Sequence, residues 1–494
     1  MNIKEAKNEI INTVQAYLSK DETGEYKIPS IRQRPILLMG PPGIGKTQIM
    51  EQVARECKIG LVAYTITHHT RQSAVGLPYI KEENFEGKIY SVTEYTMSEI
   101  IASVYSKMKE SKVKEGILFI DEINCVSETL APTMLQFLQC KKFGNEMIPK
   151  GWIIVAAGNP PEYNKSVRDF DMVTLDRVRR IDVDADYNVW KEYAVSNNIN
   201  NAILSYLDIR PANFYRIEAD VDGIEYVTAR GWEDLSNLLD VYEELGIKIT
   251  EEIIYEFLSF KDVAMDVAAY IDLYNKYKDD YAIDDILKGN VKPKIYERLL
   301  KAPFDEKITV VNLLGDGLKK HFDRIYHTKF ITDKWFAFLK SYKRELESSH
   351  DGTVLYKKMF DNMKEEYEIN VRSGFISKGE AKDMKILMDK INDNIPCEQT
   401  DDLCFEHATK DFKQMTDCLC EYEQAGEDAL ENAFDFMESA FENTQEMVVF
   451  VTELTINPRA AIFIKEQGCK RYEEYSKRLL IGSARADILA LMER

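Results

Sequence analysis

One short segment of the sequence has the residue types needed to hold a phosphate group. Residues 40–47 read GPPGIGKT, directly after the apolar run PILLM and before the helical pattern QIMEQVARE. Glycines let backbone N–H groups curl around a phosphate, and the positive end of the helix dipole adds to the attraction. Lys46 would reach the β- and γ-phosphates, and the hydroxyl of Thr47 would bind Mg²⁺. The spacing G-x-x-x-x-G-K-[ST] therefore predicts a nucleotide-binding loop rather than a chance glycine turn.

Two adjacent carboxylates follow the apolar run ILFI at residues 117–120. Neighbouring residues on a strand point to opposite faces, so Asp121 and Glu122 should have different roles. Asp121 suits a group that holds Mg²⁺ beside Thr47, usually through water. Glu122 suits a group that faces the γ-phosphate and polarises the attacking water, and this favours hydrolysis over binding alone. The alternative for Glu122 is a solvated acid at the end of a strand.

A polar amide follows another apolar run, in WIIVAAGNP at residues 152–160. Asn159 would lie at the tip of a neighbouring strand, facing the same γ-phosphate, where it could position the lytic water. The alternative is a simple Asn-Pro turn. The residues predicted to bind the nucleotide are Gly40, Pro41, Pro42, Gly43, Ile44, Gly45, Lys46, Thr47, Gln48 and Asp121, with Thr47 and Asp121 as the metal site.

These residues need a parallel sheet to position them, and the first 185 residues have the pattern of one. Apolar runs alternate there with helical patterns, which argues for a parallel sheet covered on both faces. The predicted strands are 35–39, 60–67, 117–120, 152–157 and 179–184. After residue 186 the pattern becomes helical, with turn residues at 221–223, 288–294, 313–317, 348–352 and 391–396. We therefore predict an α/β core at 1–185 with a short N-terminal helix, a helical lid at 186–278 and an all-helical C-terminal domain at 279–494.

Composition narrows the class of protein. The 494 residues include 64 Lys and Arg against 84 Asp and Glu, a net charge of −20, which disfavours binding to nucleic acid. The N-terminus lacks the apolar segment of a signal peptide, and no stretch approaches the ~20 apolar residues of a membrane span. Eight cysteines in so long a chain suggest free thiols in a reducing compartment. We expect a cytoplasmic protein without a membrane segment.

The motifs GPPGIGKT, ILFIDEIN, GNP, LDR (175–177) and TAR (228–230) together resemble those of the AAA+ ATPases, and more narrowly those of the MoxR branch. The resemblance covers residues 30 to about 245. It implies that Lys46 and Thr47 are Walker A residues, that Asp121 and Glu122 are Walker B residues, and that Asn159 is sensor 1. It further implies that Arg230 is the sensor 2 arginine at the start of a lid helix and acts on the nucleotide of its own subunit.

The same resemblance implies an arginine finger at Arg177. A guanidinium supplied by a neighbouring subunit stabilises the charge on the transferred phosphoryl group, worth roughly 10³–10⁵ in rate in well-studied cases. Active members are generally rings, most often hexamers. Family members usually carry Phe after this arginine, whereas this chain has Val178, and Arg179 and Arg180 lie close by. The choice among Arg177, Arg179 and Arg180 stays open at this point.

Two segments could contact a substrate. The resemblance implies that residues 68–95 form an insert, in which Tyr79, Phe85 and Tyr90 could grip a polypeptide. We favour the alternative that these three side chains cover the core beneath a surface hairpin. Residues 141–151 resemble the hairpin that precedes sensor 1, with Phe143 as a candidate pore contact.

Other residues that could bind a metal lack a supporting pattern. His68 and His69 have no partners at ligand spacing, so a structural role is favoured. Near the C-terminus, five candidate ligands include no C-x-x-C pair, which argues against zinc: Cys397, Cys404, His407, Cys418 and Cys420.

The acidic segment 423–446 has Phe434, Phe436, Met437 and Phe441 at helical spacing, typical of a helix buried on one face.

The leading hypothesis is an Mg²⁺-dependent, ring-forming ATPase of the MoxR type that remodels or matures a protein client. The resemblance also makes a partner with a von Willebrand factor A domain plausible. A second hypothesis is a nucleotide-gated assembly scaffold with slow hydrolysis, and a third, less favoured one is a DNA-acting motor. The sequence does not identify the client.

Overall fold

The protein divides into two compact units, each described here by itself. One consists of residues 1–189 and 365–378, and the other of residues 190–364 and 379–494. The computed structural model describes residues 1–68, 71–143, 146–163, 170, 172–220, 223–347, 351–396, 400–441 and 444–479.

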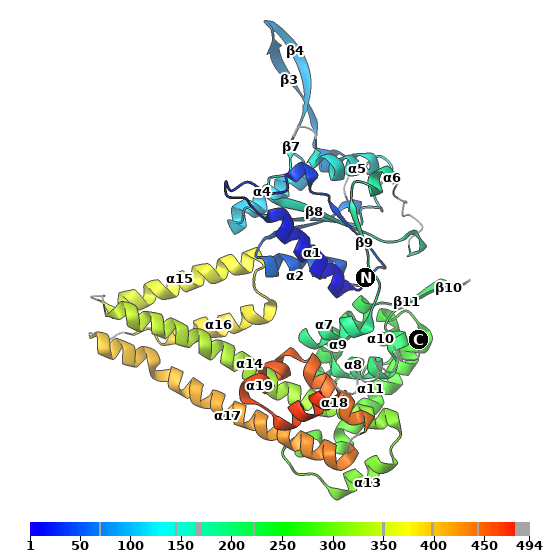
Figure 1. The fold of residues 1–494 in the computed structure, drawn as a ribbon, viewed down its shortest axis with the longest axis vertical. Helices are drawn as coiled ribbons and strands as arrows, with labels where there is room; N and C mark the ends of the chain where they lie inside the picture. Colours follow the sequence, from blue (N-terminus) through cyan, green and yellow to red (C-terminus); the bar gives the residue numbers. More distant parts are fainter. Residues whose placement is uncertain are drawn as a thin grey trace. The chain divides into compact units, whose positions relative to one another are not determined.

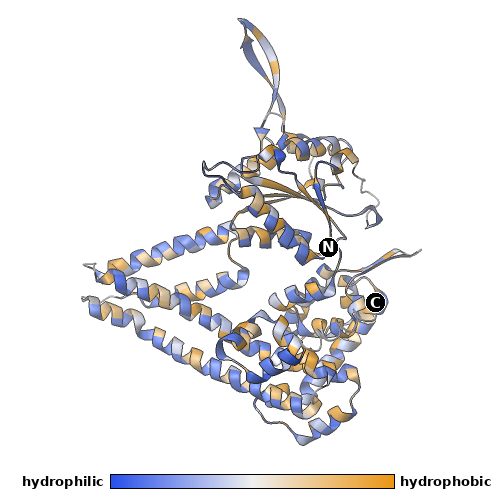
Figure 2. Ribbon diagram, viewed as in Figure 1, coloured by the Kyte–Doolittle hydropathy of each residue, from blue (hydrophilic) through white to orange (hydrophobic). Residues whose placement is uncertain are grey.

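The first unit contains a parallel five-stranded sheet (Figure 1). Its strands are β1 (Ile36–Met39), β2 (Gly60–Thr65), β5 (Gly116–Asp121), β8 (Trp152–Gly158) and β9 (Arg179–Asp182), in the spatial order β2-β5-β8-β1-β9. Every neighbouring pair runs parallel. Figure 2 shows these central strands as hydrophobic. The five predicted strands are confirmed, as is the predicted fold class of an α/β core with a large helical region after it.

Helices cover both faces of this sheet and decide where the strand ends point. On one face Leu118 and Ile120 of β5 pack in a buried cluster with α4 (Glu99–Ser111) and α5 (Ala131–Cys140). On the other face α2 (Lys46–Cys57) contacts β2 and β5 and also packs against α1 (Ile3–Leu18). Because side chains alternate along a strand, Asp121 lies on the α2 face of β5 together with Phe119.

Short antiparallel hairpins interrupt the regular layers. Strands β3 (Pro78–Phe85) and β4 (Lys88–Tyr95) form the longest, and β6 (Lys142–Phe143) with β7 (Glu146–Met147) a minimal one. Both belong to the first unit, which also includes α3 (Arg71–Val75) and α6 (Met172–Leu175). In the second unit, β10 (Arg216–Asp220) pairs with β11 (Gly223–Val227). The prediction of helices alone in this region was therefore wrong, because two short paired strands lie between the helices.

The second unit is otherwise helical. Its lid segment and the start of the tail contain α7 (Tyr187–Ser196), α8 (Asn201–Ile209), α9 (Ala229–Leu245), α10 (Glu251–Phe257), α11 (Lys261–Tyr281), α12 (Ile283–Leu287) and α13 (Pro293–Lys301). The tail continues with α14 (Phe304–Leu346), α15 (Gly352–Ser373), α16 (Lys378–Asp393), α17 (Asp401–Phe441), α18 (Gln445–Ile456) and α19 (Pro458–Gln467). Parts of three helices, α7, α15 and α16, belong to the first unit.

One predicted break in the tail is absent. Residues 313–317, LLGDG, lie inside the 43-residue helix α14. Gly317 is needed there for close packing, since a Cβ on it would lie 2.5 Å from a methyl group of Leu287. The acidic segment behaves as predicted, because Phe434, Phe436 and Met437 are all buried on α17.

No single described helix is long and apolar enough to cross a membrane. The pair α18 and α19, bent by 90° between them, meets that test only when the two are taken together.

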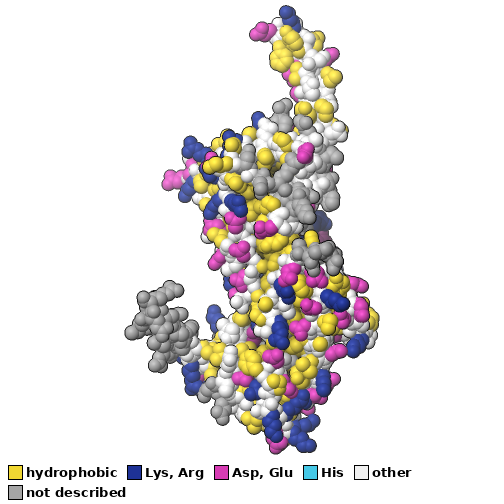
Figure 3. All heavy atoms as spheres, turned by 90° about the vertical axis from the view of Figure 1, so that its right-hand side faces the viewer, with side chains coloured by type: hydrophobic (Ala, Val, Ile, Leu, Met, Phe, Trp, Pro, Cys, Tyr) yellow, Lys and Arg dark blue, Asp and Glu magenta, His cyan; other side chains and the backbone are white. Residues whose placement is uncertain are grey.

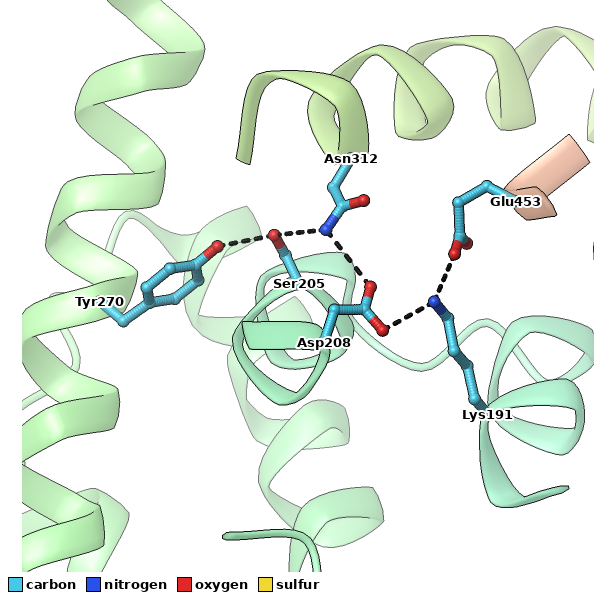
Figure 4. A network of polar contacts seen from close by, with 6 residues as sticks. All are labelled: Lys191, Ser205, Asp208, Tyr270, Asn312 and Glu453. Atoms are coloured by element: carbon cyan, nitrogen blue, oxygen red, sulfur yellow. Dashed lines mark hydrogen bonds and ion pairs between the residues drawn. The ribbon is translucent and has the colours of Figure 1, made fainter. Parts of the chain in front are cut away.

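A largely buried polar network joins helices α7 and α8 of the second unit to helices α14 and α18 (Figure 4). Lys191 of α7 is 7% exposed, and its Nζ lies 2.7 Å from Oδ1 of Asp208 on α8 and also pairs with Glu453 on α18. Asn312 of α14 donates to Oδ2 of Asp208 at 3.3 Å and to the hydroxyl of Ser205 at 2.9 Å. These contacts join α7, α8, α14 and α18 into one packed body.

Candidate active site

The phosphate loop begins where β1 ends and is shaped by glycine. Gly40 is followed by a turn in which Gly43 and Gly45 have φ values of +74° and +91°, the left-handed region that favours glycine. At Gly40 a Cβ would lie 2.6 Å from the carbonyl oxygen of Val183, so no larger residue fits. Gly45 is the residue before α2, so the loop lies at the positive end of that helix's dipole, which favours an anion.

Lys46 is the first residue of α2 and is buried. Its Nζ donates to the carbonyl oxygens of Gly40 and Pro41, both at 2.8 Å, and to Oδ1 of Asn159 at 2.9 Å. The structure thus brings together the predicted Walker A lysine and the predicted sensor 1 asparagine, although 113 residues separate them. The strand order explains this contact, because β8 and β1 are neighbours.

Thr47 meets the predicted metal-holding acid. Its hydroxyl donates to Oδ2 of Asp121 at 2.9 Å. Asp121 lies on the α2 face of β5, as described above, so its carboxylate faces the first turn of α2. A hydroxyl and a carboxylate side by side are oxygen ligands of the kind that Mg²⁺ prefers, and the residues present fit that ion.

Glu122 adopts an unusual backbone conformation, with φ at +57°. Such a conformation costs a non-glycine residue about 1–2 kcal/mol. The surrounding turn holds it, because the Glu122 N–H donates to Oδ1 of Asp121 and the Ile123 N–H donates to the carbonyl of Ala157, both at 2.9 Å. The Glu122 carboxylate accepts a 2.9 Å bond from the hydroxyl of Thr67, which follows β2. The two acids therefore diverge, as the sequence predicts.

Two polar residues near these groups escaped the sequence analysis. Thr67 lies in a short 3₁₀ turn after β2 and binds Glu122. Asn124 lies two residues after Glu122 and binds the backbone of Asn159. The sequence offered one signal that Asn124 belongs to the site, which is its position two residues after the paired acids in DEIN. No local pattern indicated that Thr67 does.

The three arginines near β9 have different surroundings. Arg179 forms an ion pair with Glu9 of α1 and donates to the hydroxyl of Thr13 at 2.6 Å, which engages it within its own unit. Arg180 donates to Oδ1 of Asp182 at 2.8 Å. Arg177 is exposed and donates to the side-chain oxygen of Gln139 at the end of α5.

Arg230 belongs to the second unit. It is the second residue of α9 and is exposed, and the N-cap residue of that helix is Thr228, whose hydroxyl accepts from the N–H of Gly231 at 3.2 Å.

The candidate substrate contacts are placed differently from the prediction. Tyr79, Phe85 and Tyr90 lie on the β3–β4 hairpin and are 43%, 51% and 50% exposed, so the favoured interpretation that they cover the core was wrong. Figure 3 shows hydrophobic and charged side chains interspersed along this hairpin. Phe143, a candidate pore contact in the sequence, is buried and stacks on Phe137 with ring centroids 4.0 Å apart. The flanking turn residues made Phe143 look exposed, whereas its side chain packs beneath α5.

Evidence for a second metal site is lacking among the described residues. No group of three or more His, Cys, Asp or Glu side chains there is placed to hold an ion. Cys404 is buried near the hydroxyl of Thr353, while Cys397 and His69 lie outside the described residues.

Comparison with known families agrees with this geometry. Residues 36–174 match the model of the family described as ATPase family associated with various cellular activities (AAA). A comparison with curated proteins gave no match. Residues 36–174 are therefore similar to an AAA ATPase domain, in a unit with a parallel sheet, and a large helical region follows them. The family supports ATP-driven activity in general.

Proposed function

We propose that the protein is a MoxR-type AAA+ ATPase that hydrolyses ATP with Mg²⁺ at a site between subunits and remodels a protein client. The observation that carries the proposal is the convergence of Lys46, Asn159, Thr47 and Asp121 at the carboxyl ends of adjoining parallel strands. Ligands of such sheets bind in the crevice outside those strand ends.

Each residue in the crevice has a role that its surroundings support. The loop 40–48 holds the phosphates through backbone N–H groups, and Lys46 adds its charge. Thr47 and Asp121 hold Mg²⁺, which would neutralise charge on the phosphate oxygens. Glu122, held apart from Asp121 by its turn, orients the attacking water and accepts its proton. Asn159 lies in the same crevice, where its side-chain oxygen accepts a hydrogen bond from Lys46.

Arg177 is the preferred trans-acting arginine. Arg179 is engaged with α1, and Arg180 with an aspartate of its own strand. Arg177 is exposed, and among the residues that the structure describes its guanidinium donates to a neutral amide oxygen, so its charge can be presented to a neighbouring subunit. We propose a ring, most often a hexamer in such proteins, with Arg230 acting within its own subunit from the start of a lid helix.

The network around Lys191 supports the proposal that movement of the lid is passed to the tail. Because it joins lid helices α7 and α8 to tail helices α14 and α18, a lid that moves with nucleotide state takes the tail with it. The client would be engaged by the exposed β3–β4 hairpin or by the tail, and a partner with a von Willebrand factor A domain could dock there. We also propose that the protein works in the cytoplasm.

The solution mass of Glu122→Gln, measured by light scattering with and without Mg-ATP, tests the assembly. Because this variant should bind ATP and stall, the proposal predicts an ATP-dependent shift to about six subunits, a closed ring of the kind common among homo-oligomers. A monomer that stays a monomer with ATP bound would contradict the autonomous ring. The alternative of a nucleotide-gated scaffold would gain support if no client or partner raised the turnover rate.

A further inference from the structure

The turn that carries Glu122 is joined to the Asn159 backbone by a single buried side chain. Asn124 is 3% exposed. Its Nδ2 donates to the carbonyl oxygen of Asn159 at 2.7 Å, and its Oδ1 accepts from the N–H of Asn159 at 3.3 Å. One planar amide therefore satisfies both backbone groups of Asn159.

The packing around this amide leaves little freedom. A Cβ on Gly158 would lie 2.6 Å from Oδ1 and 2.9 Å from Cγ of Asn124, so glycine at 158 lets the amide approach the backbone. The Ile123 N–H also donates to the carbonyl of Ala157 at 2.9 Å. The turn after β5 is thus pinned to the end of β8 at successive residues.

By holding the backbone of Asn159, Asn124 also affects where the Asn159 side chain points, although it does not contact that side chain. With its backbone held, Asn159 directs Oδ1 to the ammonium group of Lys46 at 2.9 Å. Lys46 belongs to the phosphate loop, and Glu122 lies two residues before Asn124. The Asn124 amide therefore links the group expected to orient water to the group expected to bind phosphate.

We propose that Asn124 is a positioning residue for ATP hydrolysis, which acts by fixing the Asn159 backbone relative to the Glu122 turn. This inference rests on the proposed function. The task needs a donor and an acceptor on one short planar group, which among side chains of this length only asparagine offers at neutral pH. An aspartate of the same shape would set a carboxylate oxygen against the carbonyl of Asn159.

The test uses Asn124→Asp in the full-length protein, with the exposed Asn8→Asp as a control for added charge. We expect kcat at about pH 8 to fall by about 10–100-fold, the size of effect that a small misplacement of a catalytic group can have. KM for ATP and the binding of a fluorescent ATP analogue should stay within about threefold, since Asn124 does not touch the phosphate loop.

The pH dependence provides a signature that lost stability alone would not give. The introduced carboxyl would be buried, with Asp121 and Glu122 earlier in the same turn and Lys46 across Asn159. Burial and the two acids favour its protonated form, whose O–H can donate to the carbonyl of Asn159. The kcat of Asn124→Asp relative to wild type should therefore rise as pH falls from about 8 to about 6, while the ratio for Asn8→Asp stays flat.

A double-mutant cycle tests the route through Asn159 and does not depend on one variant alone. In an Asn159→Ala background there is no side chain left to position, so adding Asn124→Asp or Asn124→Leu should change kcat by less than about threefold. Multiplicative effects, or Asn124 variants with wild-type kcat, would overturn the inference while leaving the ATPase intact. Absence of ATP turnover in the wild-type protein would instead overturn the proposed function, and the inference with it.

Discussion

Lys46 in the first unit and Lys191 in the second are buried to nearly the same extent, with exposed fractions of 8% and 7%. Lys46 donates to two backbone carbonyls and the amide oxygen of Asn159. Lys191 pairs instead with the carboxylates of Asp208 and Glu453. Neutral oxygens solvate an ammonium group without cancelling its charge, whereas two carboxylates more than cancel it.

This difference separates a lysine suited to binding phosphate from one that holds helices together. Desolvation acts to lower the pKa of Lys191, but attraction to Glu453 and Asp208 outweighs it and raises the pKa above the usual value. Burial of a lysine is therefore uninformative about function by itself. The charge of the oxygens that meet it is the informative feature.

Of the substitutions that test this difference between the lysines, we expect the one at Lys191 to have the largest effect on the free energy of unfolding. In Lys191→Met two half-buried carboxylates lose their shared cation, a change that costs up to about 3–5 kcal/mol where such a pair is fully buried. We expect the urea-induced unfolding of the second unit to shift accordingly. The exposed Lys276→Met on α11 should change the free energy of unfolding by less than about 0.5 kcal/mol. Equal stability of these two variants would show that the network contributes nothing.

At Lys46 the loss should appear in catalysis. Lys46→Met removes the charge that we propose meets the phosphates, and turnover should fall by about 10²–10³-fold, as for the loss of one transition-state donor. Its unfolding free energy should change less than that of Lys191→Met, because the oxygens of Gly40, Pro41 and Asn159 that accept from Lys46 are uncharged. The exposed Lys109→Met is the matched control, and full ATPase activity in Lys46→Met would contradict the assigned role.

Lys141 is a third buried lysine, and it should have a smaller effect, on the pH dependence of the free energy of unfolding. It is 5% exposed, its Nζ donates to the carbonyl of Ser30 at 2.6 Å, and desolvation lowers its pKa to about 8. Below that pH both the folded and the unfolded states are protonated and the full cost of burying the charge is present. Between about pH 8 and the ordinary lysine pKa the unfolded state binds more protons, so folding becomes more favourable as pH rises.

The matched variant for this effect is Lys141→Met, which has no such titration. Wild type should gain stability relative to it by about 2 kcal/mol from about pH 7.5 to about pH 9.5, measured by urea unfolding at each pH. A difference between the two proteins that does not change with pH would show that Lys141 keeps an ordinary pKa.

Much of the first unit could be predicted because its signals are local. Apolar runs gave the five strands, and their parallel order explains why Lys46 meets Asn159 and why Asp121 meets Thr47. The contacts of Thr67 and Asn124 with the site are made by single polar side chains with no periodic pattern. They depend on which strand ends become neighbours, and a sequence alone does not specify this.

The second unit was less predictable for the same physical reason. Turn residues suggested a break at 313–317, but packing of Gly317 against Leu287 keeps α14 continuous. The network of Lys191 joins residues up to 262 positions apart, from helices whose polar faces look solvated in the sequence. The burial of Phe143 was not evident from the sequence, because flanking turn residues say little about where a nearby side chain points.

The most direct test of the account is ATP turnover by wild type and by Glu122→Gln, with nucleotide binding measured on the same samples. The account predicts Mg²⁺-dependent turnover by wild type. It also predicts a loss of at least about 10²-fold in Glu122→Gln, as expected when a general base is removed, with ATP affinity kept within about threefold. Equal turnover by the two proteins, or none by wild type that binds ATP, would contradict the claim that these residues form an ATP-hydrolysing centre.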